Sequence, residues 1–198
     1  MWQNATMKDQ FTKQLLESLG GQVGDKLAGR NVVSRDQAVS ALSSLTPVIL
    51  GSLKRKQDEL GESGLEELLA NAGISEHHAD DIDDVLEKGL AGHSSQTEAI
   101  LDEETQVQTA HALSQKLNIG SAAAKKLIPM LAPIIIGMLI KKGGASKSSK
   151  GAAGGIGAIL DRNGDGSILD DIAGMVLGSG QKRGGFFQWL LSLIFKKK

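Results

Sequence analysis

The chain of 198 residues contains no cysteine and few aromatic residues. The lack of cysteine excludes disulfides, Cys-ligated zinc, iron–sulfur clusters and thiol chemistry, and it suits a reducing compartment. Aromatic residues make up 3% of the chain, whereas hydrophobic residues make up 40%. Leu, Ile, Val and Ala must therefore build the core, which favours packed helices.

Long apolar runs are also missing. A transmembrane helix needs about twenty apolar residues, and the longest run here, Leu127–Ile140, contains two prolines and a glycine. We therefore predict a buried core helix in this run. The N-terminus lacks the basic start and apolar core of a signal peptide. We expect a cytoplasmic protein, with a location peripheral to the inner membrane as the alternative.

The charges are unevenly distributed, although the net charge is −1. Residues 1–60 carry 8 basic and 6 acidic residues, residues 61–104 carry 1 and 13, and residues 105–198 carry 13 and 4. One interpretation is attraction between the acidic middle and the basic C-terminal part, within one copy or between copies. The other is that both are solvated faces.

Apolar residues recur at helical spacing, and no period-two alternation predicts a strand. A stripe beginning at Phe11 predicts a helix from about Lys8, interrupted near Gly20–Gly21. Ser34 and Gln37 have the spacing of a capping box. Pro47 is expected to kink the helix that follows or to begin a new one.

Further helices follow in the same region. A helix is expected from Ser63 to about Asn71, another from Ser75 to Gly89, and a third from Glu98 to Leu117 with Val107 in its apolar stripe. An apolar helix begins at Ser121. The fold class is predicted to be all-α.

An internal repeat relates two of these helices. Residues 38–56 align with residues 124–142 at an offset of 86 residues. The alignment pairs Pro47 with Pro133, then pairs two glycines, and both copies end in basic residues. The repeat predicts a duplicated helical-hairpin bundle.

The chain divides into four parts on this basis. They are a duplicated helical domain (1–142, with repeat copies at about 34–57 and 120–142), a Gly/Ser/Lys-rich linker (143–157), an Asp-rich loop with a short helix (158–178), and a tethered apolar tail with a basic end (179–198).

The Asp-rich loop at residues 161–171 reads Asp-Arg-Asn-Gly-Asp-Gly-Ser-Ile-Leu-Asp-Asp. Oxygen side chains at alternate positions, followed by Gly, are typical of an EF-hand Ca²⁺ loop. Ile172 replaces the bidentate Glu of that pattern, and Gly-rich sequence replaces the preceding helix. An Asx turn without metal is the alternative. The candidate Ca²⁺ ligands are Asp161, Asn163, Asp165, Ser167, Asp170 and Asp171.

Other chemical motifs are weak. His77 and Asp81 would share a helix face, but no third ligand has suitable spacing, so a solvated acidic helix is the better interpretation. No dinucleotide-binding, Walker or catalytic-triad pattern occurs. We expect that the protein is not an enzyme. The basic residues have no interleaved aromatics before the tail, so no nucleic-acid binding is expected.

Residues 186–195 are nearly all apolar, and three lysines follow them at 196–198. The segment is too short to span a bilayer. It can lie on an anionic membrane surface, dock in a groove of another protein, or fold back on its own domain. The side chains that would contact a membrane are Phe186, Phe187, Trp189, Leu190, Ile194 and Phe195.

Three features together resemble the YidB-like helical proteins, a bacterial family of unknown function. They are the paired segments Pro47–Gly51 and Pro133–Gly137, the Gly-rich stretch after the second copy, and the motif Leu160–Ile172. The resemblance covers roughly residues 8–178. It implies an all-helical, duplicated fold and no established activity.

We therefore expect a non-catalytic interaction or assembly module that binds a partner protein or itself, with Ca²⁺ as a candidate ligand of the loop. The alternative is a peripheral membrane-surface protein anchored by residues 186–198.

Overall fold

The computed structural model describes residues 12–92 and 95–144. Within these ranges the chain is helical and has no strand, which confirms the all-α prediction for this part. The elements are the π-helix η1 (Leu16–Gly20), α2 (Gly21–Gly29), α3 (Arg35–Asn71), the 3₁₀-helix η2 (Glu76–Ala79), α4 (Ile82–Leu90), α5 (Ser95–Ile100), α6 (Glu103–Leu117) and α7 (Ser121–Gly144).

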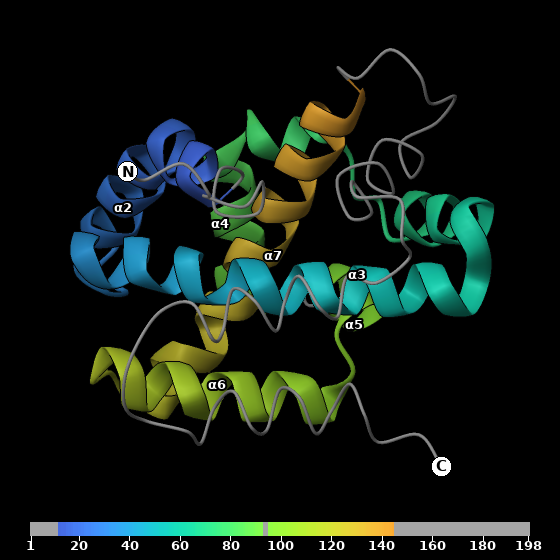
Figure 1. Ribbon diagram of the computed structural model, residues 1–198. Helices are drawn as coiled ribbons and strands as arrows, with labels where there is room; N and C mark the ends of the chain where they lie inside the picture. The colour runs from blue at the N-terminus through green and yellow to red at the C-terminus, as the bar shows by residue number, and fades with distance from the viewer. Residues whose placement is uncertain (1–11, 93–94, 145–198) are drawn as a thin grey trace, which may run out of the picture.

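Helix α7 passes through the middle of the molecule and contacts α3, η2, α4, α5 and α6 (Figure 1). Residues 131–140 are all buried. Among the described residues, Ser121–Lys142 is the one stretch with the length and composition to cross a membrane, and 78% of its apolar window is buried inside the structure. The predicted core helix is thus present at this position.

The helices around α7 pack mainly through aliphatic side chains, because residues 12–144 contain no Phe, Trp or Tyr. In α3, Leu42, Leu45, Ile49 and Leu53 are fully buried at successive helical turns. Complete burial of each such side chain contributes about 1.5–3 kcal/mol. The stability of this domain therefore depends on close aliphatic packing.

Two glycines allow other elements to approach α7 closely. A Cβ atom on Gly137 would lie 2.9 Å from both the Ala79 nitrogen and the Ser75 carbonyl oxygen of the η2 region. A Cβ atom on Gly89 of α4 would lie 2.9 Å from Cα of Met130. These distances are too short for any side chain, so glycine sets the separation of η2 and α4 from α7.

Helices α2 and α6 end in the same way. Asn31 follows α2 with a φ of 54°, and Asn118 follows α6 with a φ of 51°. In each case the N–H of the next residue donates to the carbonyl five residues earlier, over 3.2 Å after α2 and 3.1 Å after α6. This is the hydrogen bond of a Schellman ending, which asparagine tolerates better than most residues. Each turn leads directly into a long helix, α3 or α7.

The start of α3 agrees with the sequence prediction, and so does a separate helical arm that ends at Asn71. Ser34 caps the helix, with its hydroxyl accepting from the Gln37 N–H while the Gln37 side chain accepts from the Ser34 N–H. Pro47 lies inside the helix and begins no new one. The break occurs at Gly61, whose φ of 75° and ψ of 177° are open to glycine alone.

Other sequence predictions were also wrong. The single helix expected from Ser75 to Gly89 is the 3₁₀-helix η2 followed by α4, because Asp81 between them is not helical. The interruption expected at Gly20–Gly21 is the π-helix η1, which continues directly into α2. The single helix expected from Glu98 is two helices, because Asp102 is extended with a ψ of 159° and caps α6. Val107 is 50% exposed rather than part of the apolar stripe, and α6 buries Thr105 and Thr109 instead.

We predict opposite effects for alanine at the two glycines that the repeat aligns. Gly137→Ala should lower the free energy of unfolding by about 1–3 kcal/mol, because the new Cβ collides with backbone. Gly51→Ala should raise it by about 0.5–1 kcal/mol, because no atom lies within 4 Å of the new Cβ and Ala favours the helix. Urea unfolding followed by circular dichroism measures both. Equal effects at the two positions would contradict the close contact at Gly137.

Candidate functional site

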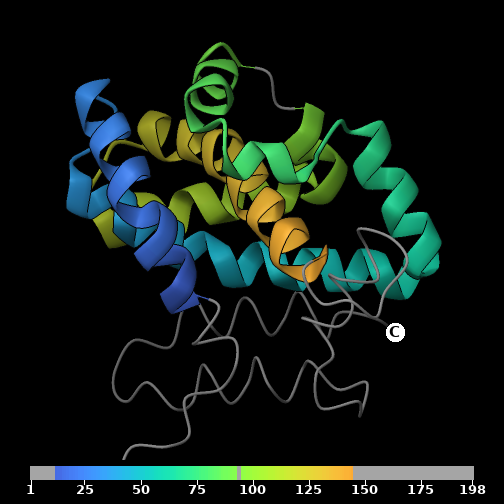
Figure 2. The ribbon, with the colours of Figure 1, turned by 90° about the horizontal axis from the view of Figure 1, so that it is seen from above.

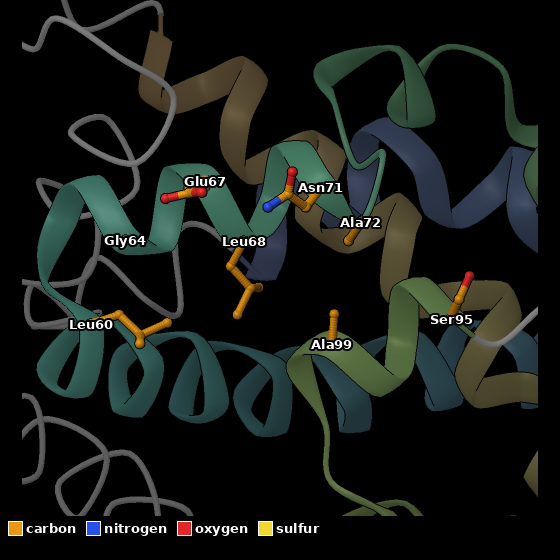
Figure 3. A pocket seen from close by; sticks show the side chains of 8 residues that line it. All are labelled: Leu60, Gly64, Glu67, Leu68, Asn71, Ala72, Ser95 and Ala99. Carbon is orange, nitrogen blue, oxygen red and sulfur yellow. The ribbon is translucent and has the colours of Figure 1, made fainter.

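The break at Gly61 divides α3 into two arms, residues 35–60 and 62–71. The second arm turns back from the end of the first, and α5 lies beside both (Figures 2 and 3). Between them is an open cavity of about 520 Å³, which we call the hairpin groove. It is lined by Leu60, Gly64, Glu67, Leu68, Asn71, Ala72, Ser95 and Ala99.

The groove has an apolar floor. Leu60, Leu68 and Ala99 point into the space between the arms and α5 (Figure 3). Leu60 is 49% exposed, and among the described residues it is one of two large hydrophobic side chains exposed to this degree. A Cβ on Gly64 would lie 2.7 Å from the Leu60 Cβ, so the turn between the arms is as tight as glycine permits. The apolar surface is therefore held open to solvent.

The rim of the groove is acidic. Residues 58–67 contain five acidic residues and no basic one. Asp58 and Glu59 form ion pairs with lysines of the first arm, at 2.7 Å and 3.9 Å. Glu67 lines the groove itself, and Glu62 is exposed beside the turn. An apolar floor with a negative rim suits an apolar ligand with a positive end.

Gln96 holds one end of α5 against the chain that leaves α3. Its side-chain nitrogen donates to the Gly73 carbonyl at 3.3 Å and lies 3.1 Å from Nε2 of His78. Burial lowers the pKa of His78, and its hydrogen bond with the Ser75 backbone acts in the opposite direction. His78 thus helps to hold α5 beside the groove through its contacts with Gln96 and Ser75.

Asp102 holds the other end of α5. Its carboxylate accepts from the Thr105 N–H at 2.8 Å, which caps α6, and from Arg55 of α3 at 2.8 Å. Partial burial raises the pKa of Asp102, but the hydrogen bonds from Thr105 and Arg55 outweigh it, so the pKa is lowered overall. The α5–α6 junction is therefore fixed to the first arm of α3.

The acidic segment around His77 and His78 holds no metal site. Among the described residues, no group of three or more His, Asp or Glu side chains is placed to bind a metal ion. The carboxylates contact basic side chains instead. Asp80 pairs with Lys141, Asp83 with Lys26 and Arg30, and Asp84 with Lys88.

The carboxylates of Asp80, Asp83 and Asp84 stay about half-exposed, so this acidic segment is solvated and also forms surface ion pairs with neighbouring elements. Asp83 joins α4 to the end of α2, and its pKa is lowered by the hydrogen bonds from Lys26 and Arg30. Asp80 joins η2 to the end of α7. Acidic residues of the middle region thus contact basic residues that precede and follow it.

The other sites predicted from sequence lie outside the described residues. These are the candidate Ca²⁺ ligands Asp161, Asn163, Asp165, Ser167, Asp170 and Asp171, and the tail at residues 186–198. Sequence reasoning missed the hairpin groove. The available signal was Leu60 followed by Gly61 within an acidic stretch, an apolar residue beside a helix breaker.

In the described part of the chain, helices pack around one buried helix, α7, and an open groove with an apolar floor lies on the surface. The chain belongs to DUF937, a family of bacterial proteins of unknown function, whose sequence model matches residues 5–142. No curated protein and no solved structure matches it. The match ends before residues 160–172, so the resemblance of that motif to the YidB-like proteins stays a prediction.

We predict that Asp102 stabilises the α5–α6 junction in two separable ways. Asp102→Ala should lower the free energy of unfolding by about 0.5–2 kcal/mol, because α6 loses its cap. Asp102→Asn keeps a capping oxygen and should cost about 0–1 kcal/mol, because only the exposed ion pair with Arg55 is lost.

The difference between wild type and Asp102→Asn should depend on pH. The folded-state pKa of Asp102 is lowered, so its contribution is fully present above the unfolded-state value of about 3.9 and disappears as the pH falls through the folded-state value. Urea unfolding at several pH values measures this. A difference that does not change with pH would contradict the charge contribution.

Proposed function

We propose that the protein is a non-catalytic helical interaction module and that the hairpin groove is its binding surface. The observation that carries the proposal is Leu60, a large apolar side chain held half-exposed beside Leu68 and Ala99. Contiguous exposed apolar surface with a polar rim is typical of a protein-binding site. The volume of about 520 Å³ falls within the range of about 300–1,000 Å³ usual for ligand pockets.

The chemistry of the lining supports binding rather than catalysis. Its polar side chains are Glu67, Asn71 and Ser95, so a Ser nucleophile would have no histidine or lysine beside it within the lining. His78 contacts Gln96 and Ser75 instead. A site that binds by apolar contact and charge needs no such pair.

We further infer that the α2–α3 and α6–α7 helix pairs arose by duplication. The repeat in the sequence supports this, and so do the matching turns at Asn31 and Asn118 and the prolines inside both long helices. The copies have since diverged. Gly137 allows the backbone of η2 to approach α7, whereas no atom lies within 4 Å of a Cβ placed on the aligned Gly51. A structure of another family member that lacks one of the two Asn turns would argue against duplication.

A second proposal concerns the Asp-rich loop, which we propose binds Ca²⁺ through Asp161, Asn163, Asp165 and the Ser167 carbonyl, with Asp170 or Asp171 completing the set. The support is the spacing of oxygen ligands and of Gly166 in the sequence. The ion would order this loop for interaction. The alternative function remains a membrane-surface protein anchored by residues 186–198.

For the groove, we predict that Leu60→Lys weakens the binding of partner proteins. The lysine places a charge on the apolar floor and repels a ligand with a positive end. Tagged full-length chain is used to capture proteins from a bacterial lysate, and quantitative mass spectrometry compares variants. Partners should fall about fivefold or more, since loss of an interface anchor costs more than about 1 kcal/mol.

The matched control is Val107→Lys on α6. Val107 is 50% exposed, like Leu60, but does not line the groove. Val107→Lys should leave the amount of captured protein unchanged, and thermal unfolding of both variants checks that they fold. Equal capture by wild type and Leu60→Lys would overturn the proposal for the groove.

For the loop, we predict a saturable heat when Ca²⁺ is titrated into the metal-stripped full-length protein. The heat should be lost in the double variant Asp161→Ala, Asp165→Ala. The control Glu62→Ala, Glu67→Ala removes the same charge from the groove rim and should keep the heat. No saturable heat in the wild type would reduce the motif to a turn.

A further inference from the structure

The apolar tail and the groove have complementary chemistry. Residues 186–195 hold eight large apolar side chains, including four of the six aromatic residues of the chain. The core of residues 12–144 packs without any of them, and among the described residues the exposed large hydrophobic side chains are Leu60, which lines the groove, and Val107 on α6. A contiguous apolar surface of this size is rarely left in water.

The spacing of the tail suits a groove between helices. Phe186, Leu190 and Leu193 are at positions i, i+4 and i+7. Amphipathic helices that bind apolar grooves place their anchor side chains at this spacing. The groove floor of Leu60, Leu68 and Ala99 offers the matching apolar surface.

The charges of the tail and of the groove are also opposite. Residues 172–198 contain five basic residues and no acidic one, and residues 58–67 beside the groove contain five acidic residues and no basic one. Opposite charges on two such segments favour their association and fix its direction. The three terminal lysines would face the rim at Glu62 and Glu67.

The chain is long enough for the tail to reach its own groove. Forty-one residues separate Gly144 from Phe186. Fully extended, they span about 135 Å, whereas a domain of this size has a radius of gyration of about 14 Å. Binding within one molecule also has a high effective concentration, which favours it over binding to a second copy.

We propose that residues 186–198 of the chain occupy the hairpin groove of the same molecule, with the apolar side chains on Leu60, Leu68 and Ala99 and the lysines at the acidic rim. This rests on the proposed function of the groove as a binding surface. The tail then competes with any partner protein for the groove, which lowers the apparent affinity of the partner without preventing its binding.

Trp189 reports this contact directly. In a Trp2→Phe background it is the sole tryptophan of the full-length chain, which contains no tyrosine. Its emission should be blue-shifted and protected from acrylamide in the purified protein at low concentration. Leu60→Lys should shift the emission to the red and raise quenching to the value measured in denaturant, whereas Val107→Lys should change neither.

A second variant keeps the test independent of any effect on folding. Glu62→Lys, Glu67→Lys reverses the charge of the exposed rim without touching the apolar floor, and it should also expose Trp189. Circular dichroism of each variant checks the helical fold.

Four results would overturn the proposal. They are an exposed Trp189 in the parent protein, protection that persists in Leu60→Lys and in the charge reversal, protection that arises only with anionic phosphatidylserine vesicles, and protection that develops only as protein concentration rises. The third would assign the tail to a membrane surface and the fourth to a second copy. None would affect the lysate comparison, because a partner can use the groove without the tail.

Discussion

The structure depends on the close approach of other helices to α7. This helix is buried on all sides over residues 131–140, and mainly aliphatic side chains supply the contacts because residues 12–144 contain no aromatic residue. Aliphatic side chains are small, so the helices must lie close together to exclude water and keep van der Waals contact. Gly137 and Gly89 permit that distance, and a methyl group at either position would collide with backbone atoms as well as with a neighbouring side chain.

The groove forms because α3 reverses direction at Gly61. The first arm packs its apolar stripe on the core, and Gly61 then reverses the chain so that the second arm can bury Leu65 and Leu69. Leu60 lies at the end of the first arm, lines the groove and stays half-exposed. Gln96 and Asp102 fix α5 at both ends with hydrogen bonds, which keeps the third wall of the groove in place.

The charge distribution connects the fold with the proposed function. Acidic residues of the middle region pair with basic residues from α2, α3 and α7. Part of the uneven charge distribution therefore forms ion pairs between helices of the domain. The acidic residues near the turn of α3 differ from these. Asp58 and Glu59 pair with lysines of their own arm, whereas Glu67 lines the groove beside its apolar floor. The basic end of the chain has the opposite character. This complementarity supports a module that regulates its own binding surface.

The sequence by itself determined the all-helical class, the buried character of α7, and the cap of α3 at Ser34. Each of these follows from local rules, since helical periodicity, a long apolar run and a capping box act over a few residues. Local rules also placed a helix boundary close to Asn71 and an apolar helix from Ser121. They misplaced Val107, because threonines at 105 and 109 face the core in its stead.

Tertiary structure alone decided which helix-breaking residues interrupt a helix and where the groove lies. Pro47 stays within a helix that the core holds on one side, whereas Gly61 breaks the same helix because the arms must fold back to bury two leucines. The aligned glycines at 51 and 137 look equivalent in sequence, yet only one faces another backbone. The groove joins residues 60–72 to residues 95–99, and no pattern within either segment reveals that they meet. The physical reason is that burial and close approach depend on contacts between distant segments, which local periodicity does not contain.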